Sequence, residues 1–328
     1  MTDTFATWAL RRGGFFTRGE AKDCGFSDAQ IQGATRSGYW VRLRHGYYAH
    51  GDYVATLDEG QRHRLLSRAV LHRLGTAYTL VGISACIAHG IEMWDSDLDT
   101  SIVHVARLGR RSGRSEAGIQ FHSIDPDSDI MVVNDLTAVR ADLAIWQAGP
   151  NLSTEGSLVC INSATHQRIV CLEELASAGA RLVNYPRTRH LRLAFTMADP
   201  RIESVGESRS FFLCWEFHLP RPEPQVKVID KRGIVIARSD LGWRKFRYLA
   251  EFDGMVKYER GRRPDESASQ VVVREKRREE LVRDEDWDMG RLIWYDLGGR
   301  QRRRSADRLR TGMDKAHSRY ARGRTIIT

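Results

Sequence analysis

The chain has 328 residues and a mass of 37.4 kDa; 41% of its residues are apolar, 28% are charged, and its net charge at pH 7 is +9. This composition is typical of folded proteins and excludes disordered, collagen-like and coiled-coil chains, while the length predicts two or three domains. The most apolar segment, YTLVGISACIAHGIEMW, has only 17 residues and contains His89 and Glu92, so it is too short and too polar to span a membrane.

The N-terminal segment and the cysteines indicate a cytoplasmic protein. The segment MTDTFATWALRR has no basic region followed by an apolar stretch, so we expect no secretory signal and no membrane partner. The five cysteines form no CxxC pair, and the eleven histidines form no HxxxH or HExxH pattern. We therefore predict mostly buried cysteines and no structural zinc.

Residues 17–48 contain the start signals of two short helices, followed by a β-prone segment. Thr17 and Glu20 form a T-x-x-E capping box, and Ser27 can cap a second helix that runs to about Ser37. The short break CGF joins these helices, as in a helix-turn-helix. In WVRLRHGYY the alternation of apolar and basic residues predicts a hairpin, the wing. These features predict a winged helix-turn-helix DNA-binding domain over residues 5–55.

The second helix and the wing carry the side chains that we expect to contact DNA. Residues 29–51 contain no acidic residue, so this face is cationic. The helix supplies Gln30, Gln32 and Arg36, whereas Arg42 and Arg44 lie on one face of the wing and suit phosphate or minor-groove contacts. The alternative is a winged helix that serves only protein contacts or packing.

Residues 60–200 alternate helical and strand-like windows and predict an α/β middle region. EGQRHRLLSRAVLHRLG has the period of a helix, and SIVHVARL and GIQFHSI are strand-like runs on either side of the basic loop GRRSGRSEA. LTAVRADLAIWQAG and LEELASAG then predict two helices. The Asp199-Pro200 pair suits a domain boundary, because a residue before proline is disfavoured in a helix.

Two segments carry a family resemblance. GFFTRGEAKDCGFSDAQIQGATRSGYWVRLRHGYYA resembles the N-terminal winged-helix domain of AbiEi-type antitoxins from bacterial type IV toxin–antitoxin systems. GISACIAHGIEMW resembles the stretch that follows this domain in actinobacterial relatives. The resemblance implies a bacterial, autorepressing DNA-binding protein with an AbiEi-like middle region and a cognate toxin as a partner.

Residues 203–298 place several carboxylates on a predicted helix–hairpin–strand–helix–strand order. Glu207 lies on the first helix, and the second hairpin strand ends near Asp240. The next strand carries Glu251 and Asp253, which project from the same face because side chains alternate along a strand. The segments SQVVVREKRREELVRDEDW and GRLIWYDL complete the order as a helix and a fourth strand.

Carboxylates that share a sheet face repel each other unless a cation lies among them. Hard oxygen ligands of this kind suit Mg²⁺ or Mn²⁺, which we expect Asp240, Glu251 and Asp253 to hold. Lys257 is expected to stabilise charge on a phosphate, and Lys276 and Arg277 on the next helix to contact the DNA backbone. Taken singly, each acidic residue could instead be a solvated surface group.

This segment resembles the PD-(D/E)XK nuclease superfamily, in the branch of the very-short-patch-repair endonucleases. The resemblance rests on GES at residues 206–208, RSDLGW at 238–243 and EFDGMVKY at 251–258. It implies a restriction-endonuclease-like domain in which Asp240 and Glu251 bind the metal and Glu207 is the helical acid. Asp253 occupies the position where many members have lysine, so either Lys257 takes that role or the site is catalytically weak.

The positive charge is concentrated at the C-terminus. Residues 298–328 contain ten basic and two acidic residues, a net +8 of the total +9. We predict a basic arm over residues 299–328 that contacts nucleic acid through side chains such as Arg302, Arg303 and Arg304. The alternative is a solvated amphipathic helix or tail without a partner.

Together these features predict a multi-domain α/β (α+β) protein. The leading hypothesis is a DNA-binding, divalent-metal-dependent endonuclease with Glu207, Asp240, Glu251, Asp253 and Lys257 in its site, acting in bacterial defence or DNA repair. The alternative is a non-enzymatic AbiEi-like antitoxin and transcriptional repressor with a vestigial nuclease fold. A third hypothesis is a protein-interaction module that neutralises a toxin.

Overall fold

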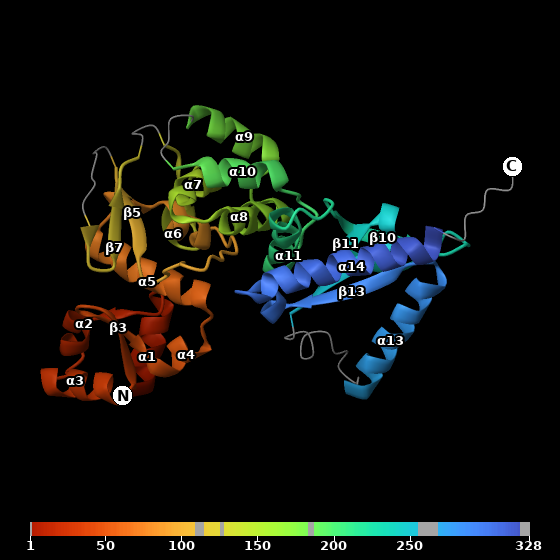
Figure 1. Cartoon of the computed structure of the whole chain (residues 1–328). Coiled ribbons are helices and arrows are strands. Elements are labelled where there is room, and N and C mark those ends of the chain that lie inside the picture. The colour runs from red at the N-terminus through yellow and green to blue at the C-terminus, as the bar shows by residue number, and fades with distance from the viewer. Residues whose placement is uncertain (1, 109–114, 125–127, 183–186, 255–267, 322–328) are drawn as a thin grey trace, which may run out of the picture. The chain divides into compact units, whose positions relative to one another are not determined.

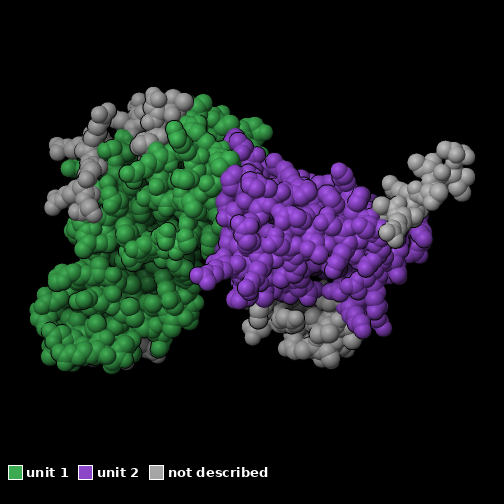
Figure 2. Space-filling model, viewed as in Figure 1, with its two compact units in different colours: residues 1–160, 167–193 green, residues 161–166, 194–328 purple. Residues whose placement is uncertain are grey.

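A computed structural model describes residues 2–108, 115–124, 128–182, 187–254 and 268–321 (Figure 1). The chain divides into two compact units, residues 1–160 with 167–193 and residues 161–166 with 194–328 (Figure 2). Sheets of three, six and four strands alternate with helices, which confirms the mixed α/β, multi-domain class. Within these described ranges no helix is long and apolar enough to cross a bilayer.

The first unit begins with the winged helix. Its elements are α1 (Thr2–Arg11), β1 (Phe16–Thr17), α2 (Arg18–Asp23), α3 (Asp28–Arg36), β2 (Trp40–Arg44) and β3 (Tyr47–His50), with strand order β1-β3-β2. Both helix starts lie where the sequence predicts them, because Thr17 with Glu20 and Ser27 with Gln30 form reciprocal capping boxes. An aromatic core that includes Phe5, Phe16 and Trp40 holds these elements together.

A six-stranded sheet follows in the same unit, with strand order β6-β7-β5-β4-β9-β8. Its strands are β4 (Tyr78–Leu80), β5 (Val103–Arg107), β6 (Ser115–Glu116), β7 (Ile119–His122), β8 (Ile130–Val133) and β9 (Leu136–Val139). The accompanying helices are α4 (Gly51–Thr56), α5 (Glu59–Leu74), α6 (Gly82–Ala88), α7 (Ala141–Ala148), α8 (Thr154–His166), α9 (Leu172–Arg181) and α10 (Arg189–Met197), of which α8 and α10 have residues in both units.

The prediction of one helix over LTAVRADLAIWQAG is wrong for its first four residues. Leu136–Val139 form strand β9, which pairs with β8 in a tight hairpin, and helix α7 begins only at Ala141. Asn134 and Asp135 connect the strands with φ angles of 51° and 62°, the backbone of a type I′ turn. The Asn134-Asp135 pair favours such a turn, but the helical spacing of the apolar residues that follow it led to the wrong prediction.

The second unit has the predicted order of helix, hairpin, strand, helix and strand. Its elements are α11 (Val205–Glu216), β10 (Glu223–Ile229), β11 (Val235–Trp243), β12 (Tyr248–Asp253), α13 (Ala268–Asp284), β13 (Asp288–Ile293) and α14 (Gln301–Ala321). The sheet order is β10-β11-β12-β13, in which only the β12–β13 pair is parallel. A Cβ at Gly206 would meet the Phe252 ring at 2.0 Å, so this glycine lets α11 pack tightly on β12.

The predicted C-terminal arm is not separate from the body of the protein over residues 301–321. These residues form α14, which packs along β12 and β13 in the second unit (Figure 1). The helix buries an apolar stripe with helical spacing, formed by Ala306, Leu309, Met313 and Ala316. Residues 322–328 lie outside the described residues.

Candidate nucleic-acid interface and acidic site

Helix α3 presents one continuous face to solvent. Ile31 is 3% exposed and anchors the helix in the aromatic core, whereas Ala29, Gln32, Gly33 and Arg36 are all exposed. Their spacing of three, one and three residues places these four side chains on a single helical face. None of these four side chains is acidic, and Asp28, one turn before Gln32, is paired with Arg18 and Lys22, so the face suits contact with a polyanion.

Gly33 lies in the middle of that face. A Cβ built on it would have no atom within 4 Å, so packing inside the described protein does not require a glycine there. Glycine in a helix destabilises the helix by about 0.5–1 kcal/mol relative to alanine. A glycine without a packing role on the exposed face of a second helix suits close approach of another backbone. Ala29 and Gly33 were not among the predicted contact residues, although their spacing with Gln32 and Arg36 places them on the same helical face.

The two glutamines predicted to contact DNA have different surroundings. The Gln30 side-chain oxygen accepts a hydrogen bond from the Ser27 backbone N–H at 2.8 Å, so it belongs to the capping box. The Gln32 oxygen accepts a bond from Arg36 Nη2 at 3.4 Å, a long contact that a ligand can replace. Gln32 and Arg36 are therefore the stronger candidates for base contact.

The wing differs from the prediction at Arg44. The pairing of β2 with β3 shifts between Arg42 and Arg44, and this bulge breaks the strict alternation that placed both arginines on one face. Arg42 is exposed, but the Arg44 side chain is only 12% exposed and pairs with Glu116 of β6 at 3.2 Å. The same carboxylate binds Arg73 of α5. Arg44 therefore lies between the wing and the sheet.

The predicted basic contacts of the second unit fall into two groups. Arg302 is mainly structural, because it pairs with Glu216 at 2.6 Å, donates to the Leu297 carbonyl at 3.0 Å and has a side chain only 13% exposed. The remaining predicted side chains are exposed on α13 and α14: Lys276, Arg277, Arg303 and Arg304. These four stay candidates for phosphate contact.

Glu207 is a buried carboxylate at the start of α11. It is 7% exposed and accepts hydrogen bonds from the Glu203 N–H at 3.0 Å, the Ser204 hydroxyl at 2.9 Å and Gln225 Nε2 at 2.9 Å. Burial, together with the nearby charge of Asp240, raises the pKa of Glu207 above its ordinary value. The structure thus brings together Glu207 and Asp240, from two different elements.

Asp240 lies where β11 and β12 diverge. Strand β11 does not end near Asp240, as the sequence suggested, but continues to Trp243 and pairs with β12 from Leu241 onward. One Asp240 oxygen accepts a hydrogen bond from the Phe252 N–H at 2.8 Å in place of a ladder bond. The Asp240 side chain therefore connects β11 to β12 beyond the last backbone pair of the two strands.

Glu251 and Asp253 both have arginine partners. Glu251 pairs with Arg278 of α13, and Asp253 lies 3.7 Å from a guanidinium nitrogen of Arg291 on β13. Across the described ranges, no three His, Cys, Asp or Glu side chains are grouped so that they could hold a metal ion. This arrangement, with guanidinium groups on two of the acids, does not fit a divalent ion held by Asp240, Glu251 and Asp253 together. Lys257 lies outside the described residues.

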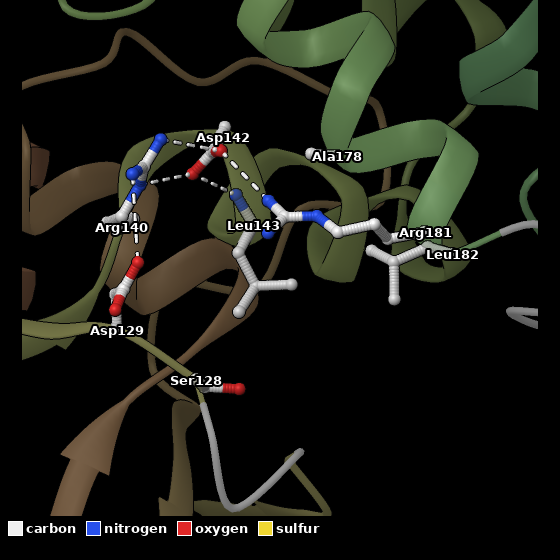
Figure 3. A pocket seen from close by; sticks show the side chains of 8 residues that line it. All are labelled: Ser128, Asp129, Arg140, Asp142, Leu143, Ala178, Arg181 and Leu182. Carbon is white, nitrogen blue, oxygen red and sulfur yellow. Dashed lines mark hydrogen bonds and ion pairs between the residues drawn. The ribbon is translucent and has the colours of Figure 1, made fainter.

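The first unit has a small hollow of about 280 Å³ at the start of α7 (Figure 3). Arg140 and Arg181 both reach the buried Asp142, at 3.0 and 3.7 Å, and Arg140 also lies 3.7 Å from Asp129. Two carboxylates thus balance two guanidinium groups among the residues that line this hollow. Its polar groups satisfy one another, so it has no excess charge for a ligand.

The comparisons with known proteins bear on the winged helix. Residues 5–49 match a family described as transcriptional regulator, AbiEi antitoxin. No curated protein matches the chain. The family match confirms the N-terminal part of the resemblance and indicates DNA binding, but it gives no support for the nuclease resemblance of residues 203–298.

Proposed function

We propose that the protein is an antitoxin-like transcriptional regulator that reads duplex DNA with helix α3. The observation that carries this proposal is the exposed, acid-free face of α3 inside the segment that matches the regulator family. Second helices of this motif enter the major groove and contact base edges with a few side chains.

The chemistry of the face suits that role. The Gln32 amide can donate and accept at once, as bidentate recognition of adenine requires, and the Arg36 guanidinium can bind the two acceptors of guanine. Ala29 and Gly33 lie beside them and leave room for the groove wall. Gln32 and Arg36 thus specify bases, while exposed cations such as Arg42 position the protein on phosphates.

As an autorepressor, the protein would bind DNA upstream of its own coding sequence. Footprinting of that region with the full chain tests this, with Arg36→Ala as the variant and Arg189→Ala, an exposed arginine of α10 in the same unit, as the matched control. We expect a protected site that Arg36→Ala loses and Arg189→Ala keeps. Absence of protection with the unmodified chain would contradict autorepression.

We also propose that the protein binds and neutralises a toxin, because the matching family is described as an antitoxin. Co-expression with the product of the adjacent gene tests it. We expect the two proteins to co-purify and the growth defect caused by the neighbour alone to disappear. Independent elution together with unrelieved toxicity would contradict it.

The second candidate function is DNA cleavage by the second unit with Mg²⁺ or Mn²⁺. It is favoured by the proximity of the Glu207 and Asp240 carboxylates and by the predicted order of helices and strands, which the second unit has. Glu251, Asp253 and Lys257 follow in the sequence. A bound ion would activate water and neutralise phosphate charge. Its binding would require Arg278 to leave Glu251, because that guanidinium now neutralises the carboxylate.

Plasmid cleavage by the full chain, with and without each metal, tests this second candidate. If this candidate holds, the chain nicks the plasmid only with metal, and Asp240→Ala abolishes nicking while DNA binding stays intact, because the substitution removes a carboxylate and no cation. If single-stranded, duplex and mismatched DNA all stay uncut with either metal, the second unit is not a nuclease and the regulator function stands alone.

A further inference from the structure

A second hollow of the first unit lies between the wing, α5 and the strand β6, and has a volume of about 730 Å³. We refer to it as the basic hollow. The residues that give it its character are Arg42, Arg44, His45, Arg73 and Glu116. Small-molecule sites have volumes of about 300–1,000 Å³, so the basic hollow is large enough for a phosphorylated ligand or a stretch of nucleic-acid backbone.

The charges of the described residues that line the basic hollow do not balance. These residues include three arginines and one carboxylate, Glu116, which together sum to +2 without His45. Arg73 uses both oxygens of Glu116, one of them at 2.9 Å, and Arg44 shares an oxygen at 3.2 Å. A partly buried guanidinium that must share its counter-ion is destabilised relative to one with its own partner.

Arg44 shows this shortage most clearly. Its Nε atom is buried and, in the part of the chain that the structure describes, makes no hydrogen bond. Burial and the neighbouring Arg73 lower the pKa of Arg44, whereas hydrogen bonding to Glu116 raises the pKa of Arg73. The opposite directions agree with the geometry, in which Arg73 binds both oxygens of Glu116 and Arg44 binds one of them. A buried donor without an acceptor is a group that a ligand oxygen would satisfy.

We infer that the basic hollow binds a phosphate group, held by Arg44 with Arg42 and His45 and in competition with Glu116. Guanidinium groups bind phosphate oxygens through charge-assisted, paired hydrogen bonds, which meets the need of Arg44. The phosphate can come from the DNA backbone, in which case this inference rests on the proposed function, or from a free nucleotide.

Two substitutions with opposite expected effects test this inference. Arg44→Gln removes the under-compensated cation and leaves the Arg73–Glu116 pair in place, so the fold should persist. Glu116→Gln removes the competing carboxylate and should tighten phosphate binding. A residue that only supported the fold would not improve binding when it is changed. Arg189→Gln serves as the charge-matched control, and circular dichroism with thermal melting checks that each variant is folded.

The full chain and each variant are titrated with a duplex over a range of salt concentrations, and separately with inorganic phosphate and a nucleoside monophosphate. If the source is DNA, Arg44→Gln should weaken duplex binding about tenfold and reduce the logarithmic salt slope by about one, and Glu116→Gln should strengthen binding. If the source is a free nucleotide, Arg44→Gln should abolish saturable phosphate or nucleotide binding and leave the duplex affinity unchanged.

Equal binding of every probe by folded Arg44→Gln, Glu116→Gln and Arg189→Gln variants would overturn the inference. Arg36→Ala separates this result from a failure of the proposed function. If Arg36→Ala weakens duplex binding and Arg44→Gln does not change any titration, α3 reads DNA and the basic hollow binds no phosphate. If the unmodified chain binds phosphate but no duplex, the regulator function fails and the basic hollow stands.

Discussion

Gly33 occupies the centre of an exposed helical face, where an alanine would make the helix more stable. Because a Cβ there meets open space, Gly33→Ala should raise the free energy of unfolding by about 0.5–1 kcal/mol. The same methyl group should weaken DNA binding if the glycine serves close approach to the groove. Urea unfolding and duplex titration of the variant check both expectations. Higher stability with unchanged DNA affinity would show that α3 does not approach DNA at this residue.

Three buried side chains of the first unit, His63, Ser84 and His104, form a polar chain with the partly buried His122 that disfavours protonation. His63 Nε2 lies 2.9 Å from the Ser84 hydroxyl oxygen, which also accepts a hydrogen bond from the backbone N–H of His104 at 2.8 Å. The His104 ring continues the chain, because its Nδ1 lies 2.9 Å from His122 Nε2. Burial, assisted by His122, lowers the pKa of His104 to about 3, and burial lowers the pKa of His63 and His122. The folded protein therefore holds these rings neutral.

This chain of histidines predicts a loss of stability in mild acid. The unfolded chain binds protons below about pH 6.5 and the folded chain does not, so the stabilisation is complete above pH 6.5 and is lost as the pH falls toward 3. His104 alone should contribute a loss of about 2 kcal/mol by pH 5. Unfolding by urea at pH 7.5 and pH 5 measures it, and His104→Asn should reduce the difference. The pKa of the nearby Asp99 is lowered from an already acidic value, so it does not titrate in this window. Equal stability at the two pH values would contradict the buried neutral chain.

In helix α14 the spacing of the apolar residues is a better guide to the structure than the concentration of positive charge. The net +8 of the C-terminal residues suggested an arm, yet Ala306, Leu309, Met313 and Ala316 recur at helical spacing and mark a buried stripe. Charge density describes only the solvent side of an amphipathic helix. The partner of that stripe, the β12–β13 face, is distant in sequence and therefore could not be read from local pattern.

The arginines of α14 should differ in their contribution to stability according to the contacts that each makes. Arg302 loses an ion pair with Glu216, a bond to the Leu297 carbonyl and contact with the Phe212 ring when it becomes alanine, so Arg302→Ala should lower the free energy of unfolding by about 1–3 kcal/mol. Arg304 is exposed, and Arg304→Ala should change it by less than about 0.5 kcal/mol. Chemical unfolding of the two variants gives the comparison. Equal effects would mean that the Arg302 contacts add no net stability.

The exposed cations of the second unit give a prediction about salt. If α14 contacts DNA, changing Arg303 and Arg304 together to glutamine should lower the logarithmic salt slope of duplex binding by about two, because each neutralised phosphate contributes about 0.9. The same change at Lys276 and Arg277 tests α13 as a matched pair. A pair whose replacement leaves the slope unchanged does not face the phosphates.

Local signals predicted most elements of the fold but not the surroundings of the candidate site. Capping boxes and apolar periods located the helices around α2, α3 and α5 and the order of the second unit. The bulge in β2 and the partners Arg278 and Arg291 of the acidic residues arise from strand pairing and packing between distant segments. Sequence spacing placed Glu251 and Asp253 on one strand, whereas only tertiary structure shows that arginines neutralise them.

At the scale of the whole chain, the winged helix is the part that we propose reads DNA. The family match covers residues 5–49, and in the proposed function the exposed face of α3 provides the base-reading groups. The second unit adds exposed cations and an acidic site whose carboxylates are paired with arginine. Binding specificity should therefore belong to the first unit, and substitutions in the second unit should change affinity for all sequences alike.

Selection of bound duplexes from a random-sequence pool by the full chain tests this claim most directly, with Gln32→Ala and Arg189→Ala selected in parallel. We expect the unmodified chain and Arg189→Ala to enrich one short motif and Gln32→Ala to relax one base position of it, because a bidentate base contact is worth about 1–3 kcal/mol. No enrichment by the unmodified chain, or the same motif at the same strength with Gln32→Ala, would contradict recognition of DNA by α3.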